Sequence, residues 1–229
     1  MKSFTFSILV YNHEKWICEH LESIKYLIER YKPPVVDILI SDDASSDKSK
    51  AIIDDWLLLN SYLFRNIHKI YNTKNIGTVS CCKKIIKECK TDILKITAGD
   101  DVYSFKNIFM FSNDNNESSI VSGIPLYIID GELTNDTKSD LLHVSSSIIY
   151  RDKSRFDMLH ATNAPNILYN LNQLRQVIDH PLFEKIKIVE DLLIQVLLSN
   201  KKFTFTQIYT PFVYYRRTEG SSYLIKGSQ

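Results

Sequence analysis

The most informative segment of the sequence is Ile93-Leu94-Lys95-Ile96-Thr97-Ala98-Gly99-Asp100-Asp101. A largely apolar, β-rich segment leads into a glycine and then into two adjacent carboxylates. Two carboxylates held close together repel each other, and a bound divalent cation removes that repulsion. Oxygen ligands of this kind suit Mn²⁺ or Mg²⁺, often together with a phosphate. Glycine followed by two aspartates is also ordinary turn chemistry, so these residues alone leave a solvated turn open.

The composition is typical of a soluble globular protein with one large domain or two small ones. The chain has 229 residues, of which 44% are hydrophobic and 24% are charged, and its net charge is +1. This charge gives no reason to expect a nucleic-acid partner. No segment approaches ~18 consecutive apolar residues, and no signal peptide is apparent, so we expect no transmembrane segment. The four cysteines lack a paired Cys-x-x-Cys pattern, which predicts free thiols in a reducing compartment.

Strands and helices are expected to alternate through the first hundred residues. The predicted strands are 4–10, 35–40, 68–71 and 93–97, and the predicted helices are 15–31, 47–59 and 79–89. The strands are short apolar runs, whereas the helices have apolar residues at helical spacing. This alternation predicts a parallel sheet with right-handed crossovers.

Polar residues follow the strands of this predicted sheet. They are Tyr11-Asn12, Asp42-Asp43, Asn75 to Gly77, and Asp100-Asp101. Ligands of parallel α/β sheets bind beyond the carboxyl ends of the strands. The four polar clusters are therefore expected to converge on one binding site, although Asp42-Asp43 also suits a turn and a helix cap.

The second half of the chain is less regular. One strand, or two broken at Gly123 and Pro125, is expected over 120–129. A polar loop is expected over 131–138, a strand over 143–150, a helix over 161–178, a helix over 192–198 opened by Glu190-Asp191, a strand interrupted by Pro211 over 203–215, and a polar tail over 216–229. Proline inside a strand predicts an edge strand or two separate segments.

Five motifs, taken together and in order, resemble those of the inverting family-2 glycosyltransferases with the GT-A fold. They are Ser7 to Asn12, Ile40 to Asp47, Asn75 to Gly77, Gly99 to Asp101, and Glu190-Asp191. The resemblance covers about residues 4–217. It implies an α/β fold of the GT-A class, with a Rossmann-like, mixed, mostly parallel sheet flanked by helices. It also implies one domain over 1–229, in which 1–102 bind the nucleotide sugar and 103–229 form the acceptor-binding half and a C-terminal segment.

The resemblance implies a set of residues that bind the donor. These are Tyr11, Asn12, Asp42, Asp43, Asn75, Gly77, Lys83, Asp100, Arg216 and Arg217. Tyr11 would flank the base, and Asp42, with Asp43, would bind the base and the ribose. Asp100 and Asp101 would hold Mn²⁺ or Mg²⁺ at the diphosphate. Ala98 stands where the family motif usually has its first aspartate.

The resemblance also implies that Asp191 is the general base that deprotonates the acceptor, with Glu190 as its supporting neighbour. One carboxylate opposite the leaving diphosphate would give in-line displacement and inversion. From the residues alone, Glu190 and Asp191 can also be first-turn acids that favour a helix amino terminus.

Some basic residues have two interpretations. Lys83 can contact phosphate or lie on a solvated helix face. Arg216 and Arg217 are equal candidates for the diphosphate, because strand alternation points only one of them inward. His13 follows the first strand and is interpreted as a surface residue rather than a ligand.

The implied function is that of a metal-dependent enzyme of the hexosyltransferase type. It would move one sugar from a nucleoside diphosphate donor to a hydroxyl of a glycan or lipid-linked glycan, in bacterial surface polysaccharide biosynthesis. UDP is favoured, since a carboxylate such as Asp42 can accept a hydrogen bond from the uracil N–H. The expected location is cytoplasmic, with peripheral association with the inner face of the membrane left open.

Two other functions have less support in the sequence. A catalytically degenerate GT-A module that binds nucleotide without turnover is supported by Ala98 alone. An oxidoreductase with a dinucleotide cofactor is disfavoured, because no Gly-x-Gly-x-x-Gly follows the first strand.

Overall fold

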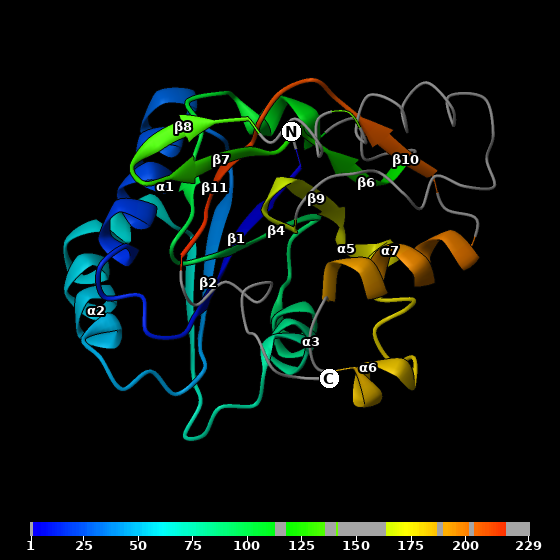
Figure 1. Ribbon diagram of the computed structural model, residues 1–229, viewed down its shortest axis with the longest axis horizontal. Helices are drawn as coiled ribbons and strands as arrows, with labels where there is room; N and C mark the ends of the chain where they lie inside the picture. Colours follow the sequence, from blue (N-terminus) through cyan, green and yellow to red (C-terminus); the bar gives the residue numbers. More distant parts are fainter. Residues whose placement is uncertain are drawn as a thin grey trace.

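The structure is a computed structural model in which helices cover both faces of a central sheet (Figure 1). It describes residues 2–112, 118–135, 141, 164–186, 190–201 and 204–218. The predicted class is confirmed, because the seven-stranded sheet has the order β10-β6-β9-β4-β1-β2-β3 and is mixed but mostly parallel. No helix of the described residues is long and apolar enough to cross a membrane.

The first half follows the predicted alternation of strand and helix. Its elements are β1 (Phe4–Val10), α1 (Ile17–Tyr31), β2 (Val36–Asp42), α2 (Ser49–Asn60), a 3₁₀ turn η1 (Ser61–Leu63), β3 (Asn66–Tyr71), α3 (Thr78–Glu88) and β4 (Ile93–Ala98). β1 pairs in parallel with β2 and with β4. β2 runs further than predicted, because Ser41 and Asp42 still pair with Leu9 and Val10.

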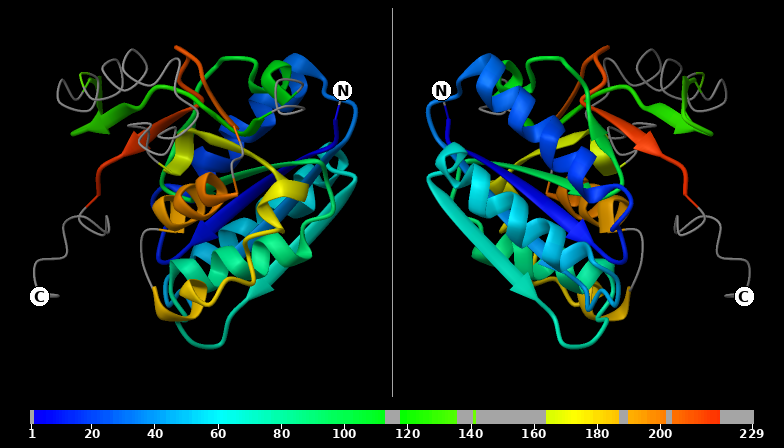
Figure 2. Two further views of the ribbon diagram at one scale, coloured as in Figure 1. Left: turned by 90° about the vertical axis from the view of Figure 1, so that its right-hand side faces the viewer. Right: turned by 90° about the vertical axis from the view of Figure 1, so that its left-hand side faces the viewer.

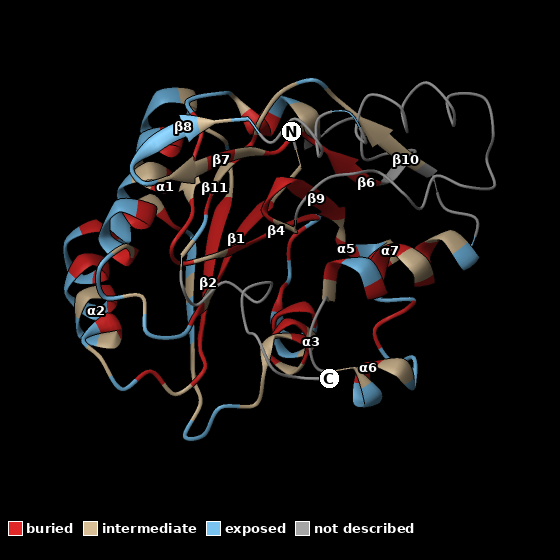
Figure 3. Ribbon diagram, viewed as in Figure 1, coloured by how far each residue is buried: buried red, intermediate tan, exposed pale blue. Residues whose placement is uncertain are grey.

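Two apolar clusters hold the helices against the sheet. Alternate residues of β1, such as Phe6 and Ile8, are buried under α1 and α2. On the opposite face, Leu94 and Ile96 of β4 pack with α3 and with the later helices. The central strands are therefore buried on both faces, as Figure 3 shows. Cys18, Cys81, Cys82 and Cys89 form no disulfide, as predicted.

A second, four-stranded sheet lies beside the main one (Figures 1 and 2). Its order is β5 (Val102–Tyr103), β11 (Val213–Arg216), β7 (Leu126–Ile129) and β8 (Glu132–Thr134). β6 (Ser118–Ser122) and β10 (Thr204–Gln207) belong to the main sheet. The predicted segments 120–129 and 203–215 each therefore divide between two sheets, which confirms the breaks expected at Gly123 and Pro211. A Cβ at Gly123 would lie 2.4 Å from the Thr210 backbone oxygen, so the crossing requires glycine.

The helix predicted over 161–178 is wrong in its described part. Residues 164–174 form a 3₁₀ turn η5 (Ala164–Asn166), β9 (Ile167–Asn170) and a short helix α5 (Leu171–Leu174). β9 is antiparallel to β4 and to β6, and burial on both of its faces overrides local helix propensity.

The remaining described elements complete the second half. They are η2 (Ile108–Ser112), α6 (Leu182–Lys185) and α7 (Glu190–Asn200). β8 lies within the predicted loop 131–138, because Asp130-Gly131 make a tight turn that returns the chain alongside β7. The strand predicted over 143–150 lies outside the described residues, and so does the end of the predicted tail.

Candidate functional site

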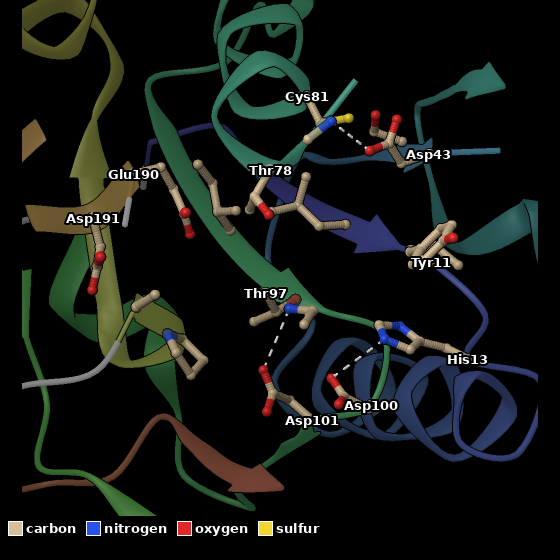
Figure 4. Close-up of a pocket in the computed structure, with 18 of the residues that line it drawn as sticks. Tyr11, His13, Asp43, Thr78, Cys81, Thr97, Asp100, Asp101, Glu190 and Asp191 are labelled. Atoms are coloured by element: carbon tan, nitrogen blue, oxygen red, sulfur yellow. Dashed lines mark hydrogen bonds and ion pairs between the residues drawn. The ribbon is translucent and has the colours of Figure 1, made fainter. Parts of the chain in front are cut away.

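A cavity of about 290 Å³ opens where the carboxyl ends of β1, β2 and β4 meet the start of α7 (Figure 4). Most of the residues predicted for the site line this cavity. They are Tyr11, Asp43, Asn75, Gly77, Asp100, Asp101, Glu190 and Asp191. Asn12, Asp42, Lys83, Arg216 and Arg217 are not among its lining residues. In the structure, the polar loops therefore converge at one edge of the sheet.

The two aspartates at the end of β2 have different environments. Asp43 lines the cavity and accepts hydrogen bonds from the backbone N–H groups of Ile76 and Gly77, each at 2.8 Å. Gly77 has a φ of 84°, which favours glycine. Asp42 is fully buried and accepts a hydrogen bond from the Ser45 N–H at 2.9 Å. Asp43 thus fixes the loop before α3, while Asp42 supports the loop after β2.

The first two residues of the loop after β1 have different roles. Tyr11 lines the cavity with 49% of its surface exposed, which leaves its ring free to flank a flat ligand. Asn12 has a φ of 58°, and its side-chain oxygen accepts a hydrogen bond from the Ser46 N–H at 2.9 Å. Its own N–H donates to Ser45 Oγ at 2.9 Å. Asn12 therefore joins the β1 and β2 loops.

The two aspartates after Gly99 also differ. Asp101 is buried, and its carboxylate accepts hydrogen bonds from the backbone N–H groups of Arg216 at 3.2 Å and Ala98 at 3.3 Å. Burial raises the pKa of Asp101 well above its ordinary value, and the charge of Asp100 adds to this rise. The carboxylate of Asp100 accepts fewer hydrogen bonds than that of Asp101. Its Oδ2 accepts one from the Thr218 hydroxyl at 3.2 Å, and its Oδ1 lies 3.9 Å from His13 Nε2.

A divalent cation fits this turn through Asp100. Among the residues that the structure describes, no group of three or more His, Cys, Asp or Glu side chains could hold a metal ion by itself. Mg²⁺ is commonly bound by one or two carboxylates, and the other ligands come from substrate phosphates and water. Asp100 meets this requirement, whereas both oxygens of Asp101 already accept backbone hydrogen bonds. The donor set favours Asp100 over Asp101 as the ligand.

His13 is a cavity residue that the sequence interpretation missed. Its backbone N–H donates to Ser49 Oγ at 2.8 Å, and its ring packs on Gly99, where an added Cβ would lie 2.9 Å from Nδ1. No lysine or arginine is among the lining residues in the described part of the chain, so His13 is the one basic side chain of the lining. Its position three residues after the end of β1 was the available signal.

Glu190 and Asp191 lie across the cavity from Tyr11 and Asp43 (Figure 4). They form the first turn of α7, and the Leu192 N–H donates to Asp191 Oδ1 at 2.8 Å. Burial raises the pKa of Glu190 to about 7, and the charge of Asp191 adds to this rise. Burial also raises the pKa of Asp191. Two carboxyl groups with raised pKa values in a cleft are suited to proton transfer.

The three predicted basic residues do not line the cavity, and each of them contacts a residue outside its lining. Lys83 forms an ion pair with Glu184 of α6. The Arg216 guanidinium donates to Glu19 at 2.6 Å and to the Asp100 backbone oxygen at 2.8 Å. Arg217 stacks on the Tyr127 ring, with its guanidinium carbon 4.6 Å from the ring centroid.

Tyr215 is the β11 residue that lines the cavity. Strand alternation therefore points Arg216 toward α1, where its guanidinium carbon also lies 4.3 Å from the Trp16 ring centroid.

Comparison with known proteins gives a family and a fold. A family model described as glycosyl transferase family 2 matches residues 5–170. Two curated relatives are the uncharacterized protein Rv1520 of Mycobacterium tuberculosis and the uncharacterized protein Mb1547 of Mycobacterium bovis. Each is 31% identical over 94 residues, which are 41% of this chain and 25% of the relative. The matched part thus spans a quarter of these relatives.

Solved structures share the fold at low sequence identity. S. aureus TarS 1–349 in complex with UDP-GlcNAc has a TM-score of 0.69 at 15% identity, covering 99% of this chain and 62% of that one. The mannosyltransferase PcManGT of Pyrobaculum calidifontis, in complex with GDP-Man and Mn²⁺, has a TM-score of 0.67 at 14% identity, covering 96% and 58%. The predicted GT-A fold is therefore confirmed, and this chain spans about three fifths of those structures.

Proposed function

This chain belongs to glycosyl transferase family 2, and from that premise we propose that it moves one sugar from a nucleoside diphosphate to an acceptor hydroxyl with inversion. The observation that carries the proposal is the arrangement of the cavity. Loops that suit a nucleotide lie on one side, and two carboxyl groups with raised pKa values lie on the other. Inverting transfer needs this opposition, because a base must act on the face away from the leaving group.

UDP is the proposed nucleotide of the donor. Tyr11 offers an exposed ring at the cavity, and Asp43 offers a carboxylate beside it. A carboxylate accepts a hydrogen bond from the uracil N–H, and adenine has no such imide N–H. The TarS structure with UDP-GlcNAc supports this choice, while the PcManGT structure with GDP-Man makes guanosine the competitor to test.

Mn²⁺ or Mg²⁺ is the proposed cofactor, with Asp100 as its protein ligand. A bound divalent cation supplies charge that offsets the diphosphate as it leaves. Asp101 keeps the turn in place through its bonds to Ala98 and Arg216. The cavity has five acidic side chains and no lysine or arginine in the described lining, so an anionic donor needs such a charge.

Asp191 is the proposed general base. Its carboxyl group lines the cavity, and its raised pKa brings it nearer to the range in which a base works at neutral pH. Glu190 would support it, because a neutral Glu190 beside Asp191 avoids a second buried charge.

The remaining assignments follow from the family and rest on the same proposal. Residues 1–102 would bind the donor, and 103–229 would bind the acceptor, a glycan or a lipid-linked glycan of bacterial surface polysaccharide biosynthesis. The reaction would take place in the cytoplasm, at the inner face of the membrane where the acceptor is lipid-linked.

A thermal-shift screen tests the proposal. UDP, GDP, dTDP and ADP, and their common sugar conjugates, would be added to the purified chain with and without Mn²⁺. A ligand that binds only the folded state raises the melting temperature, so UDP with Mn²⁺ should give the largest rise. The absence of a rise with any nucleotide would contradict the proposal. Ala98 supports a degenerate module as the second candidate, and release of free sugar or glycoside from the best-binding donor would exclude it.

A further inference from the structure

His13 and Asp100 form a pair whose spacing is too long for a hydrogen bond. His13 Nε2 lies 3.9 Å from Asp100 Oδ1, whereas a charge-assisted N–H···O bond is about 2.7–2.9 Å long. Metal–ligand bonds of about 2.1 Å on each side span up to about 4.2 Å, so one ion can contact both atoms. Both side chains line the same cavity, and Figure 4 shows them facing each other.

The turn after β4 has few free carboxylate oxygens. Ala98 has none, and both oxygens of Asp101 accept backbone hydrogen bonds. Asp100 Oδ2 accepts the Thr218 hydroxyl, which leaves Oδ1 toward His13. Among the residues of this turn that the structure describes, a cation at Asp100 would therefore have one strong protein ligand unless His13 is the second.

His13 is held in place before any ligand arrives. Its backbone N–H is bonded to Ser49 Oγ, and its backbone oxygen accepts the N–H groups of Trp16 and Ile17 as α1 begins. The ring packs on Gly99, which leaves no room for a Cβ there. The backbone bonds fix the loop and the packing on Gly99 limits the ring, so His13 would lose little conformational entropy on binding a ligand.

We propose that His13 is a direct nitrogen ligand of the metal at Asp100, and that it makes the site select Mn²⁺ over Mg²⁺. Imidazole nitrogen is a ligand of transition metals, whereas Mg²⁺ takes oxygen ligands. The inference rests on the proposed donor site, because the diphosphate and water complete the coordination. The loop after β1, which is not part of the aspartate motif, would thereby contribute a metal ligand.

The test is spectroscopic and needs no acceptor. Mn²⁺ bound to the full chain in the presence of UDP would be examined by electron spin-echo envelope modulation, which detects a directly coordinated ¹⁴N. The parent chain and a His68→Ala control, altered at an exposed histidine of β3, should give nitrogen coupling. His13→Ala should lose it. His13→Gln keeps a similar size without an imidazole, so it serves where the alanine variant is unstable, and it should lose the coupling as well.

Metal titrations of UDP binding give the second measurement. Mn²⁺ should bind the parent–UDP complex more tightly than Mg²⁺, and His13→Gln should weaken Mn²⁺ by about tenfold or more while changing Mg²⁺ little. Bound Mn²⁺ without nitrogen coupling in the parent would overturn the inference and leave the donor site intact. UDP binding that is equal with and without metal would contradict both the inference and the proposed cofactor. A parent chain that binds neither UDP nor any other nucleoside diphosphate would contradict the proposed function itself.

Discussion

The Asp101 carboxylate accepts a hydrogen bond from the backbone N–H of Arg216 at 3.2 Å, although 115 residues separate them in the sequence. The other carboxylate oxygen accepts the Ala98 N–H, and the Arg216 side chain donates to the Asp100 backbone oxygen. β11 is thereby fastened to the turn that ends β4. Both oxygens of the Asp101 side chain therefore hold backbone N–H groups, whereas the Asp100 side chain holds this segment only through the Thr218 hydroxyl.

Replacement of Asp101 should cost more stability than replacement of Asp100. Asp101→Ala removes the acceptor of the buried Arg216 N–H and of the partly buried Ala98 N–H, and such a loss costs about 1–3 kcal/mol for a buried group, offset in part by the removal of a buried carboxylate. Asp100→Ala removes the acceptor of the Thr218 hydroxyl but also a charge that repels Asp101, so its net cost should be smaller. Urea unfolding followed by circular dichroism measures both. Equal free energies of unfolding for the two variants would show that Asp101 does not fasten β11.

Asp191→Asn should bind the donor nucleotide like the parent and lose transfer by about 10²- to 10⁴-fold, because it removes the proposed general base. Glu190→Gln serves as the matched control, since it changes the adjacent carboxyl group in the same way and should lose less. Initial rates with a competent donor and acceptor give the comparison. If Asp191→Asn transfers sugar at the parent rate, Asp191 is not the general base.

Glu190 should make stability fall as the pH rises. Its pKa is raised from 4.5 to about 7 in the folded protein, so the folded state binds this proton more tightly than the unfolded state. The stabilisation is fully present below about pH 4.5 and is lost as the pH rises through about 7, with a change of up to about 3 kcal/mol.

Unfolding of the parent and of Glu190→Gln at pH 5 and pH 8 isolates this effect. The parent should lose stability relative to the variant between the two pH values. Asp191, whose pKa is also raised, remains in both proteins and largely cancels in the difference. If the parent and Glu190→Gln differ in unfolding free energy by the same amount at pH 5 and at pH 8, the pKa of Glu190 is not raised.

Gly99→Ala should disturb the site more than an exposed glycine does. The added Cβ would lie 2.9 Å from both His13 Nδ1 and Ile17 Cδ1, so one of these side chains must shift. Overpacking of this kind costs about 1–3 kcal/mol. Gly131→Ala is the control for strain without crowding, since nothing lies within 4 Å of its added Cβ and its φ is +83°. Thermal unfolding and UDP affinity should separate the two variants, with only Gly99→Ala weakening UDP binding.

The donor side of the site was predictable because it depends on local patterns. Each polar cluster follows a strand whose apolar residues mark it clearly, and parallel strands bring their carboxyl ends to one edge. This reasoning places Asp43 and Asp100 at the cavity, whereas Glu190, at the start of a helix, was assigned to the site only through the family resemblance. The strand breaks at Gly123 and Pro211 were also visible, because glycine and proline have local backbone preferences.

The misses depend on contacts between distant parts of the chain. β9 looks helical locally and becomes a strand because β4 and β6 pair with it on either side. Arg216 faces α1 rather than the cavity because Glu19 and Trp16 lie there, 197 residues from Arg216 in the case of Glu19. The sequence gives no sign that His13 has a partner, because Asp100, which lies beside it, follows a different strand, β4. Local periodicity in the sequence does not reveal contacts between residues that lie far apart in the chain.

Whether this cavity is a metal-assisted donor site can be measured by calorimetric titration of UDP into the purified chain, with and without Mn²⁺. UDP should bind at one site with an affinity that Mn²⁺ raises by about tenfold or more, and an Asp100→Ala variant should fold normally but show no such rise with the metal. A parent chain that binds no UDP, or binds it with the same affinity in Asp100→Ala with Mn²⁺ present, would contradict the assignment of this cavity as a metal-assisted donor site.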